Sequence, residues 1–280
     1  MLHNYIILCY INLQKNLKQW KETTQMTPDI SQIIDIAREC GSIIKNAFDT
    51  HVELKDQDRK SLVTMVTQYD VMVQEVLEKR LKEIMPEASF LGEEGVQTYQ
   101  KNGYCFVCDP IDGTTNFVKN YNYSAVSIAL LYDGKPVLGV VYNPYADEMF
   151  WAEKGKGAFC NGKRIHTTKA DLGGSLVAFG TGTKTPDEVD KVWDLVQQYF
   201  EKAIDIRRVG AGALDLCNVA CGRNGVFWEL KLESWDYAAA YLVVVEAGGI
   251  VKVSKNEDIT DFFAQSSIIA TAHKDIDILF

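Results

Sequence analysis

Apolar residues recur at helical spacing in two segments near the start of the chain. Thr27-Pro28-Asp29 provides a helix start, and the residues after it that share one face are Ile30, Ile33, Ile34, Ala37, Cys40 and Ile44. A second helix is expected over residues 71–85, where apolar positions are again three or four apart and Pro86 ends the pattern. Between the two helices, Leu62–Thr67 has the composition of a strand.

The middle of the chain is rich in strand-type segments that are separated by turn signals. We expect strands at residues 89–91, 104–108, 124–132, 134–143 and 148–153. Asp133-Gly134 joins the third and fourth of these strands, and Asn161-Gly162 indicates a further tight hairpin.

Beyond Ala170, strands alternate with helices. Helices are expected at residues 187–202, 213–221 and 237–247. Strands are expected at residues 175–181, 204–209, 226–230, 250–253 and 268–272. We therefore predict a mixed α/β (α+β) protein, whose two tightly joined halves meet between residues 145 and 175.

The composition allows a large core and argues against some partners. The 280 residues are 47% hydrophobic, and 29 Lys and Arg stand against 38 Asp and Glu, which leaves a net charge of −9. The pI near 5.0 argues against a nucleic-acid or anionic-membrane surface, because either needs a basic face. The apolar run Tyr5–Leu13 is too short to span a bilayer and lacks the flanks of a signal peptide. Residues 1–26 are expected to be an amphipathic or disordered extension, and no membrane partner is expected.

The seven cysteines are scattered along the chain instead of forming a disulfide framework. Cys105-x-x-Cys108 could indicate a redox or zinc site, but it lies in an apolar run, with no second CxxC and no nearby histidine pair. We interpret the cysteines as structural core thiols, which favours a reducing, cytoplasmic location.

The segment Asp109-Pro-Ile-Asp-Gly-Thr-Thr-Asn-Phe117 follows one predicted strand and precedes another. Carboxylates at a strand end, followed by Gly113 and hydroxyl residues, suit a hard cation that binds a phosphate. The amides and hydroxyls of Thr114 and Thr115 can open a short helix and hold an anion there. A turn that merely caps a helix has no need of both carboxylates. This segment therefore predicts a magnesium centre.

Three further acidic segments are candidates to join Asp109 and Asp112 in one metal centre. Glu93 and Glu94 lie in the Gly-flanked turn 92–95 after a strand, whereas Asp70 and Asp236 each precede an apolar helical segment. Taken alone, a solvated loop explains the first site and helix N-caps explain the other two. Beside the central segment, they indicate carboxylates that converge on one site.

Together these motifs resemble those of the inositol monophosphatase family of magnesium-dependent, lithium-sensitive phosphatases. The resemblance rests on DPIDGTTNF at 109–117, GEEG at 92–95, VTQYD at 66–70 and WDYAAAYLVVVEAGG at 235–249, in the family's order and approximate spacing. It implies a layered αβαβα sandwich of the sugar-phosphatase type. An N-terminal subdomain (27–150) would carry the main metal site, and a C-terminal subdomain (151–280) would add Asp236 and substrate contacts.

The resemblance implies two to three Mg²⁺ ions. The first ion would be bound by Glu93, Asp109, the carbonyl of Ile111 and Asp112. The second would be bound by Asp109, Asp112 and Asp236, and a third, looser ion by Asp70 and Glu93. Among these ligands, Glu93 and Asp70 are also assigned to catalysis, in which Thr114 would orient the attacking water with support from Asp70.

The resemblance also implies substrate contacts. Gly113 and Thr114 would donate to the phosphate, with Asp112 and Asp236 close to it. Lys60 best fits a lysine that precedes the VTQYD segment, and Lys55 is the alternative. On the sugar side the implied contacts are Gly210, Ala211, Gly212 and Glu229, although Ala211 replaces a hydroxyl residue that is usual there.

These features predict a phosphatase acting on a small phosphate monoester by direct attack of water, without a phosphoenzyme. The preferred substrate is myo-inositol monophosphate. The alternatives are phosphatases of fructose 1,6-bisphosphate, nucleoside 3′,5′-bisphosphate or NADP, and a catalytically idle regulatory relative. A haloacid-dehalogenase-type site is excluded, because two residues instead of one separate Asp109 from Asp112. By analogy with the family, a homodimer is expected.

Overall fold

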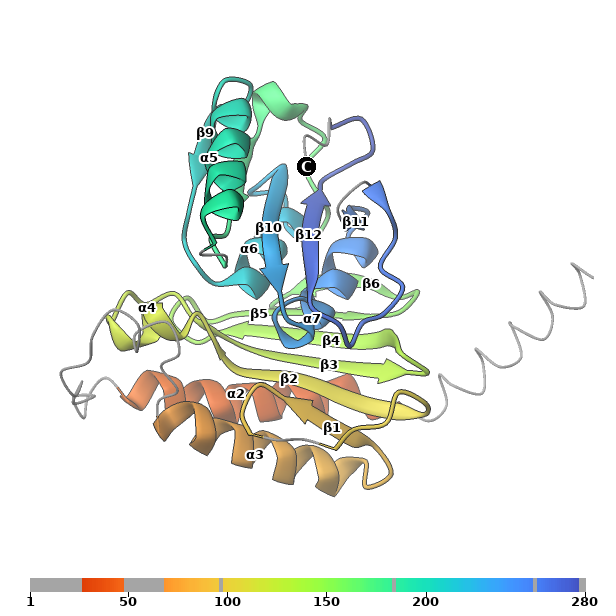
Figure 1. The fold of residues 1–280 in the computed structure, drawn as a ribbon. Coiled ribbons are helices and arrows are strands. Elements are labelled where there is room, and N and C mark those ends of the chain that lie inside the picture. The colour runs from red at the N-terminus through yellow and green to blue at the C-terminus, as the bar shows by residue number, and fades with distance from the viewer. Residues whose placement is uncertain (1–26, 48–67, 96–97, 183–184, 254–255, 277–280) are drawn as a thin grey trace, which may run out of the picture.

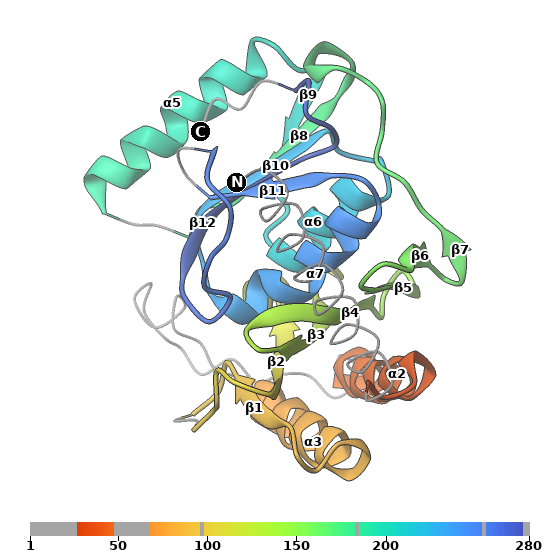
Figure 2. The same cartoon turned by 90° about the vertical axis from the view of Figure 1, so that its right-hand side faces the viewer.

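The computed structural model describes residues 27–47, 68–95, 98–182, 185–253 and 256–276. Two sheets alternate with three layers of helices (Figures 1 and 2). The order of layers is α2 and α3, the first sheet, α6 and α7, the second sheet, and α5. The predicted αβαβα sandwich is therefore confirmed.

The outer helical layer covers one face of the first sheet. It consists of α2 (Ile30–Ala47) and α3 (Gln68–Ile84), which pack against strands β2, β3 and β4. The predicted helical faces are buried, as Ile33 and Ile44 in α2 and Leu77 in α3 illustrate. However, α3 begins three residues before the predicted start, so Asp70 lies inside its first turn and is not its N-cap. The strand expected at 62–67 lies outside the described residues.

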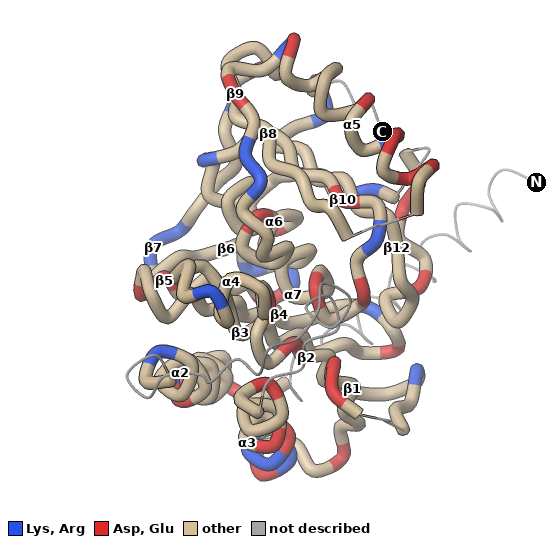
Figure 3. The backbone as a smooth tube through the Cα atoms, turned by 60° about the vertical axis from the view of Figure 1, so that its left-hand side comes forward, with Lys and Arg blue, Asp and Glu red and all other residues tan. Residues whose placement is uncertain are grey.

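The first sheet has seven strands in sequential order, with β1 and β2 parallel and the other pairs antiparallel. The strands are β1 (Ser89–Gly92), β2 (Tyr104–Asp112), β3 (Ala125–Tyr132), β4 (Lys135–Asn143), β5 (Glu148–Glu153), β6 (Gly157–Cys160) and β7 (Lys163–Arg164). Asn161 and Gly162 both have positive φ values, as the predicted tight hairpin requires. The edge strand β7 is basic and exposed (Figure 3), which discourages pairing with another sheet.

The second sheet has five strands in the order β11-β12-β10-β8-β9. These are β8 (Leu176–Phe179), β9 (Asp205–Arg207), β10 (Val226–Leu232), β11 (Ile250–Lys252) and β12 (Ser266–Thr271). Helix α5 (Pro186–Phe200) covers its outer face, and its inner face packs on α6 (Gly212–Ala220), with α7 at β11.

Helix α7 (Ser234–Glu246) lies between the two sheets, which explains why its sequence is apolar on nearly every side. Small residues allow α7 to approach β4 closely. A Cβ atom on Gly139 of β4 would lie 2.4 Å from the carbonyl oxygen of Ala239 in α7. This contact fixes the height of α7, and with it Asp236 in its first turn, above the first sheet.

The cysteines of the described residues are all free, and Cys105 and Cys108 are fully buried within β2. Burial raises the pKa of Cys105 to about 11. The interpretation as core thiols is thus confirmed for the buried cysteines, whereas Cys160 and Cys221 are only partly buried and Cys9 lies outside the described residues. None of the helices in the described part of the chain is long and apolar enough to cross a membrane.

Candidate metal centre

The acidic segment lies at the end of β2, not after it as predicted. The strand continues through Pro110 to Asp112, and its register against β3 shifts between Asp109 and Asp112. Residues three apart in a regular strand point to opposite faces, so this irregularity is what allows both carboxylates to face one side. The Asp109 carboxylate also accepts a hydrogen bond from the amide of Ile111, at 2.9 Å.

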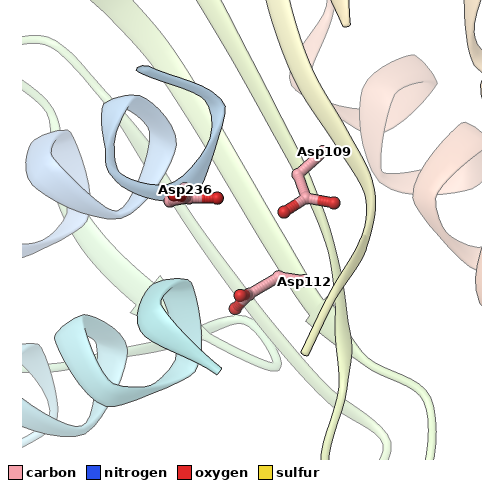
Figure 4. Close-up of side chains that lie close together, drawn as sticks. All are labelled: Asp109, Asp112 and Asp236. Carbon is pink, nitrogen blue, oxygen red and sulfur yellow. The ribbon is translucent and has the colours of Figure 1, made fainter. Parts of the chain in front are cut away.

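Three carboxylates converge from both halves of the chain. One oxygen from each of Asp109, Asp112 and Asp236 lies within 4.8 Å of the others, and the side chains point toward one another in Figure 4. Asp109 and Asp112 are 2% and 6% exposed. Among the described residues, no Lys or Arg forms an ion pair with these three carboxylates.

The electrostatics of this group favour a cation. Burial, followed by repulsion from Glu93, Asp112 and Asp236, raises the pKa of Asp109 well above its usual range. Loss of solvent and the charge of Asp112 raise the pKa of Asp236 in the same direction. Buried carboxylates without a basic partner are costly. Oxygen donors of this kind suit Mg²⁺, which prefers carboxylates and retained waters, so the site fits the implied metal.

Asp112 connects the two halves of the molecule. Its two carboxylate oxygens accept hydrogen bonds from the amides of Gly212, at 3.1 Å, and Ala213, at 2.9 Å, in the first turn of α6. Ala211, the N-cap of α6, has no side chain for this task, so Asp112 supplies the cap from a different element. Burial raises the pKa of Asp112 to about 6, although these amides oppose the rise.

Asp236 lies in the first turn of α7 and is not its N-cap, which is Glu233. Its Oδ2 atom accepts a hydrogen bond from the amide of Glu233, at 2.7 Å. The carboxylate therefore braces the start of the helix while it faces Asp109 and Asp112.

Glu93 follows β1 in a bend and is exposed. Loss of solvent around its carboxyl group raises its pKa to about 7, with repulsion from Asp70 and Glu94, whereas a hydrogen bond with Asp109 opposes the rise. Its carboxyl group therefore faces the cluster.

Helix α4 (Thr114–Val118) begins directly after Asp112-Gly113, as the sequence predicts. The Thr114 hydroxyl donates to the carbonyl oxygen of Ile111, at 3.1 Å, and lies 3.5 Å from the Asp70 carboxylate. Gly113 has a φ of 85°, and a Cβ atom there would crowd Ala211 and the carbonyl of Gly210. The glycine thus permits both the left-handed turn and the close approach of the loop that precedes α6.

The predicted sugar-side residues lie next to this turn. Glu229, on β10, accepts a hydrogen bond from the amide of Gly182, at 2.7 Å, and burial raises its pKa to about 7. A Cβ atom on Gly212 would lie 3.9 Å from the Glu229 carboxylate. The structure therefore brings Glu229 and the loop 210–212 together beside Asp112. Lys60 and Lys55 lie outside the described residues.

Sequence reasoning missed the residues that support this loop. The side-chain amide of Asn116 donates to the carbonyls of Tyr123 and Val209, both at 2.9 Å, and of Gly210, at 3.2 Å. Asp215, only 1% exposed, lies 3.3 Å from the hydroxyl of Tyr123. Asn116 belongs to the DPIDGTTNF motif, so the sequence offered a reason to consider it a site residue. Asp215 lies in none of the motifs, so the sequence offered no such reason.

The chain resembles known proteins over most of its length. The model of the inositol monophosphatase family matches residues 25–279. Inositol monophosphatase 2 of Solanum lycopersicum is 38% identical over 226 residues, which make up 78% of this chain and 84% of the relative. The Nus factor SuhB of Escherichia coli (strain K12) is 36% identical over 228 residues, or 81% and 85% of the two chains. The crystal structure of extragenic suppressor protein suhB from Bartonella henselae superposes with a TM-score of 0.78 and 33% identity, covering 88% of this chain and 94% of that one.

Proposed function

The chain belongs to the inositol monophosphatase family, and from this premise we propose that it hydrolyses a small phosphate monoester, with myo-inositol monophosphate as the first candidate substrate. The observation that carries the proposal is the convergence of Asp109, Asp112 and Asp236 within 4.8 Å, with Glu93 and Glu229 at its sides. The close relatives include inositol monophosphatases and SuhB proteins of similar identity, so the substrate is part of the proposal.

We assign two to three Mg²⁺ ions to the acidic group. Glu93, Asp109, the Ile111 carbonyl and Asp112 would hold the first ion, and Asp236 would complete the second with Asp109 and Asp112. Asp70 and Glu93 would hold the third. When bound, Mg²⁺ would acidify a water and neutralise charge on the leaving oxygen.

The residues around the ions would orient water and substrate. The Thr114 hydroxyl, beside Asp70, would hold the attacking water, and Asp70 would accept a proton through it. The amides of Gly113 and Thr114 stand at the start of α4 and would donate to the phosphate.

Glu229 and the loop 210–212 would position the alcohol part of the substrate. A carboxylate that accepts hydrogen bonds from two neighbouring hydroxyls suits a polyol. Gly180 and Gly182 leave room for the Glu229 side chain itself, because a Cβ atom at either position would collide with it. Ala211 offers no hydroxyl group, so the backbone and Glu229 would determine the preference between polyols.

A panel of phosphate monoesters tests the proposal. Phosphate release would be measured with inositol, sugar and nucleotide phosphates, in Mg²⁺ with and without Li⁺. We expect the highest kcat/KM for an inositol monophosphate, inhibition by Li⁺ and no burst of alcohol before phosphate release. A folded protein that binds Mg²⁺ but releases phosphate from none of them would instead be an idle regulatory relative. A trapped aspartyl-phosphate would contradict direct attack by water.

Homodimerisation and a cytoplasmic location remain predictions.

A further inference from the structure

A buried glutamine on α3 contacts the segment that carries Glu93. Gln74 lies one helical turn after Asp70 and is 8% exposed. Its Nε2 atom donates to the carbonyl oxygen of Glu94, at 2.7 Å, and its Oε1 atom accepts from the amide of Glu94, at 2.8 Å. The side chain thus satisfies both backbone groups of the residue next to Glu93.

This pairing depends on the chemistry of a primary amide. An uncharged amide offers a donor and an acceptor side by side, which matches the amide and carbonyl of one extended residue. A carboxylate offers two acceptors and a hydrocarbon offers neither, so each would leave at least one backbone group of Glu94 without this partner.

Gly92 provides an independent sign of the same contact. A Cβ atom at this position would lie 2.2 Å from Oε1 of Gln74 and 2.6 Å from its carboxamide carbon. Gly92 is not among the glycines with positive φ, so the close approach of Gln74, and not a turn, accounts for the missing side chain. The first glycine of the GEEG motif therefore makes room for Gln74.

We propose that Gln74 is a positioning residue, which holds the segment 92–94 so that the Glu93 carboxylate faces Asp109 in the metal centre. The proposal rests on the proposed function only in taking Glu93 as a metal ligand. Helix α3 then contributes two residues to the site: Gln74, which holds the segment 92–94, and Asp70, which faces Thr114. Residues that orient metal ligands commonly contribute about 10- to 100-fold to metal affinity.

Gln74→Met tests the proposal, because methionine has a similar length but lacks the amide. Titration of the full chain with Mg²⁺ alone, followed by calorimetry, should show weaker binding by about 10-fold or more. The Mg²⁺ concentration for half-maximal activity on inositol 1-phosphate should rise equally, while kcat at saturating Mg²⁺ should stay within about 3-fold. Hydrogen exchange at the Glu94 amide should accelerate, since that amide loses its acceptor.

Leu77→Val is the matched control, since Leu77 is fully buried in the next turn of α3 and has no hydrogen bond to Glu94. It should lower thermal stability without changing Mg²⁺ binding. If Gln74→Met does not fold, Gln74→Glu keeps the acceptor for the Glu94 amide and should bind Mg²⁺ with intermediate affinity.

Unchanged Mg²⁺ affinity and unchanged Glu94 exchange in a folded Gln74 variant would overturn the positioning role, whatever the enzyme's activity. Conversely, weakened Mg²⁺ binding in a chain that hydrolyses no phosphate monoester would support the role of Gln74 and contradict the proposed function.

Discussion

At the scale of single residues, the carboxylates of the site differ in the backbone amides from which they accept hydrogen bonds. Asp112 uses both oxygens to accept amides of α6, whereas Asp109 uses one oxygen for the amide of Ile111. An asparagine has only one carbonyl oxygen and two N–H groups. The same substitution will therefore have different consequences for the fold at these two positions.

Asp109→Asn should abolish phosphatase activity and leave the fold intact, because the asparagine oxygen can still accept from Ile111. It also removes a buried charge, so the metal-free variant should melt at or above the temperature of the wild type. Asp112→Asn should be equally inactive but less stable, by about 1–3 kcal/mol, because an amide of α6 loses its acceptor. Activity assays and thermal unfolding in EDTA measure both effects. Equal stability of the two variants would contradict the capping role of Asp112.

At the scale of elements, hydrophobic spacing predicted nearly every described helix and strand, but it misplaced the boundaries that matter at the site. Pro110 was expected to lie beyond its strand, yet β2 continues through it to Asp112 with a shifted register. Helices α3 and α7 both begin before the acidic residue that was expected to cap them. The end of β2 depends on its pairing with β3, a partner that no local pattern records. The start of α7 instead depends on a local capping box, in which Glu233 is the N-cap and Asp236 the third residue.

The contact between α7 and β4 gives a prediction at this scale. Gly139→Ala would place a methyl group against the backbone of Ala239, so α7 must move away from the sheet. We expect a loss of about 1–3 kcal/mol in the free energy of unfolding, as for other overpacked cores. Weaker Mg²⁺ binding should accompany it, because Asp236 moves with α7. Gly173→Ala is the control, since its nearest neighbour would be 3.7 Å away. If Gly139→Ala and Gly173→Ala lost similar amounts of stability and Mg²⁺ affinity, the contact between α7 and β4 would not be what positions Asp236.

At the scale of the whole molecule, the motifs predicted which carboxylates belong together, but not how the layers bring them together. Asp109, Asp112 and Asp236 were identifiable because the motifs that contain them are distinctive. Gln74 and Asn116 escaped notice because each acts on the backbone of a segment 20 or more residues away. The strand order of the second sheet also has no local signal. The site is thus a junction, in which α6 and α7 from one half rest on β2 from the other.

A junction built from buried carboxylates should make stability depend on pH and on Mg²⁺ together. The folded state raises the pKa of Asp112 from 3.8 to about 6 and that of Glu93 from 4.5 to about 7, and burial also raises the pKa values of Asp109 and Asp236 well above their usual range. The metal-free native state therefore binds more protons than the unfolded chain, so its stability falls as pH rises through this range.

We accordingly expect the melting temperature in EDTA to fall between about pH 4 and about pH 7. Saturating Mg²⁺ should reduce the fall, because the ions bind the ionised carboxylates of the native state and not the unfolded chain. The stabilisation by Mg²⁺ should therefore grow with pH, and it should be smaller in Asp109→Asn. Thermal unfolding across this pH range, with EDTA and with Mg²⁺, measures the difference directly. If the melting temperature fell equally with pH in EDTA and in Mg²⁺, the prediction would be wrong. These carboxylates would then not be the groups through which Mg²⁺ stabilises the folded protein.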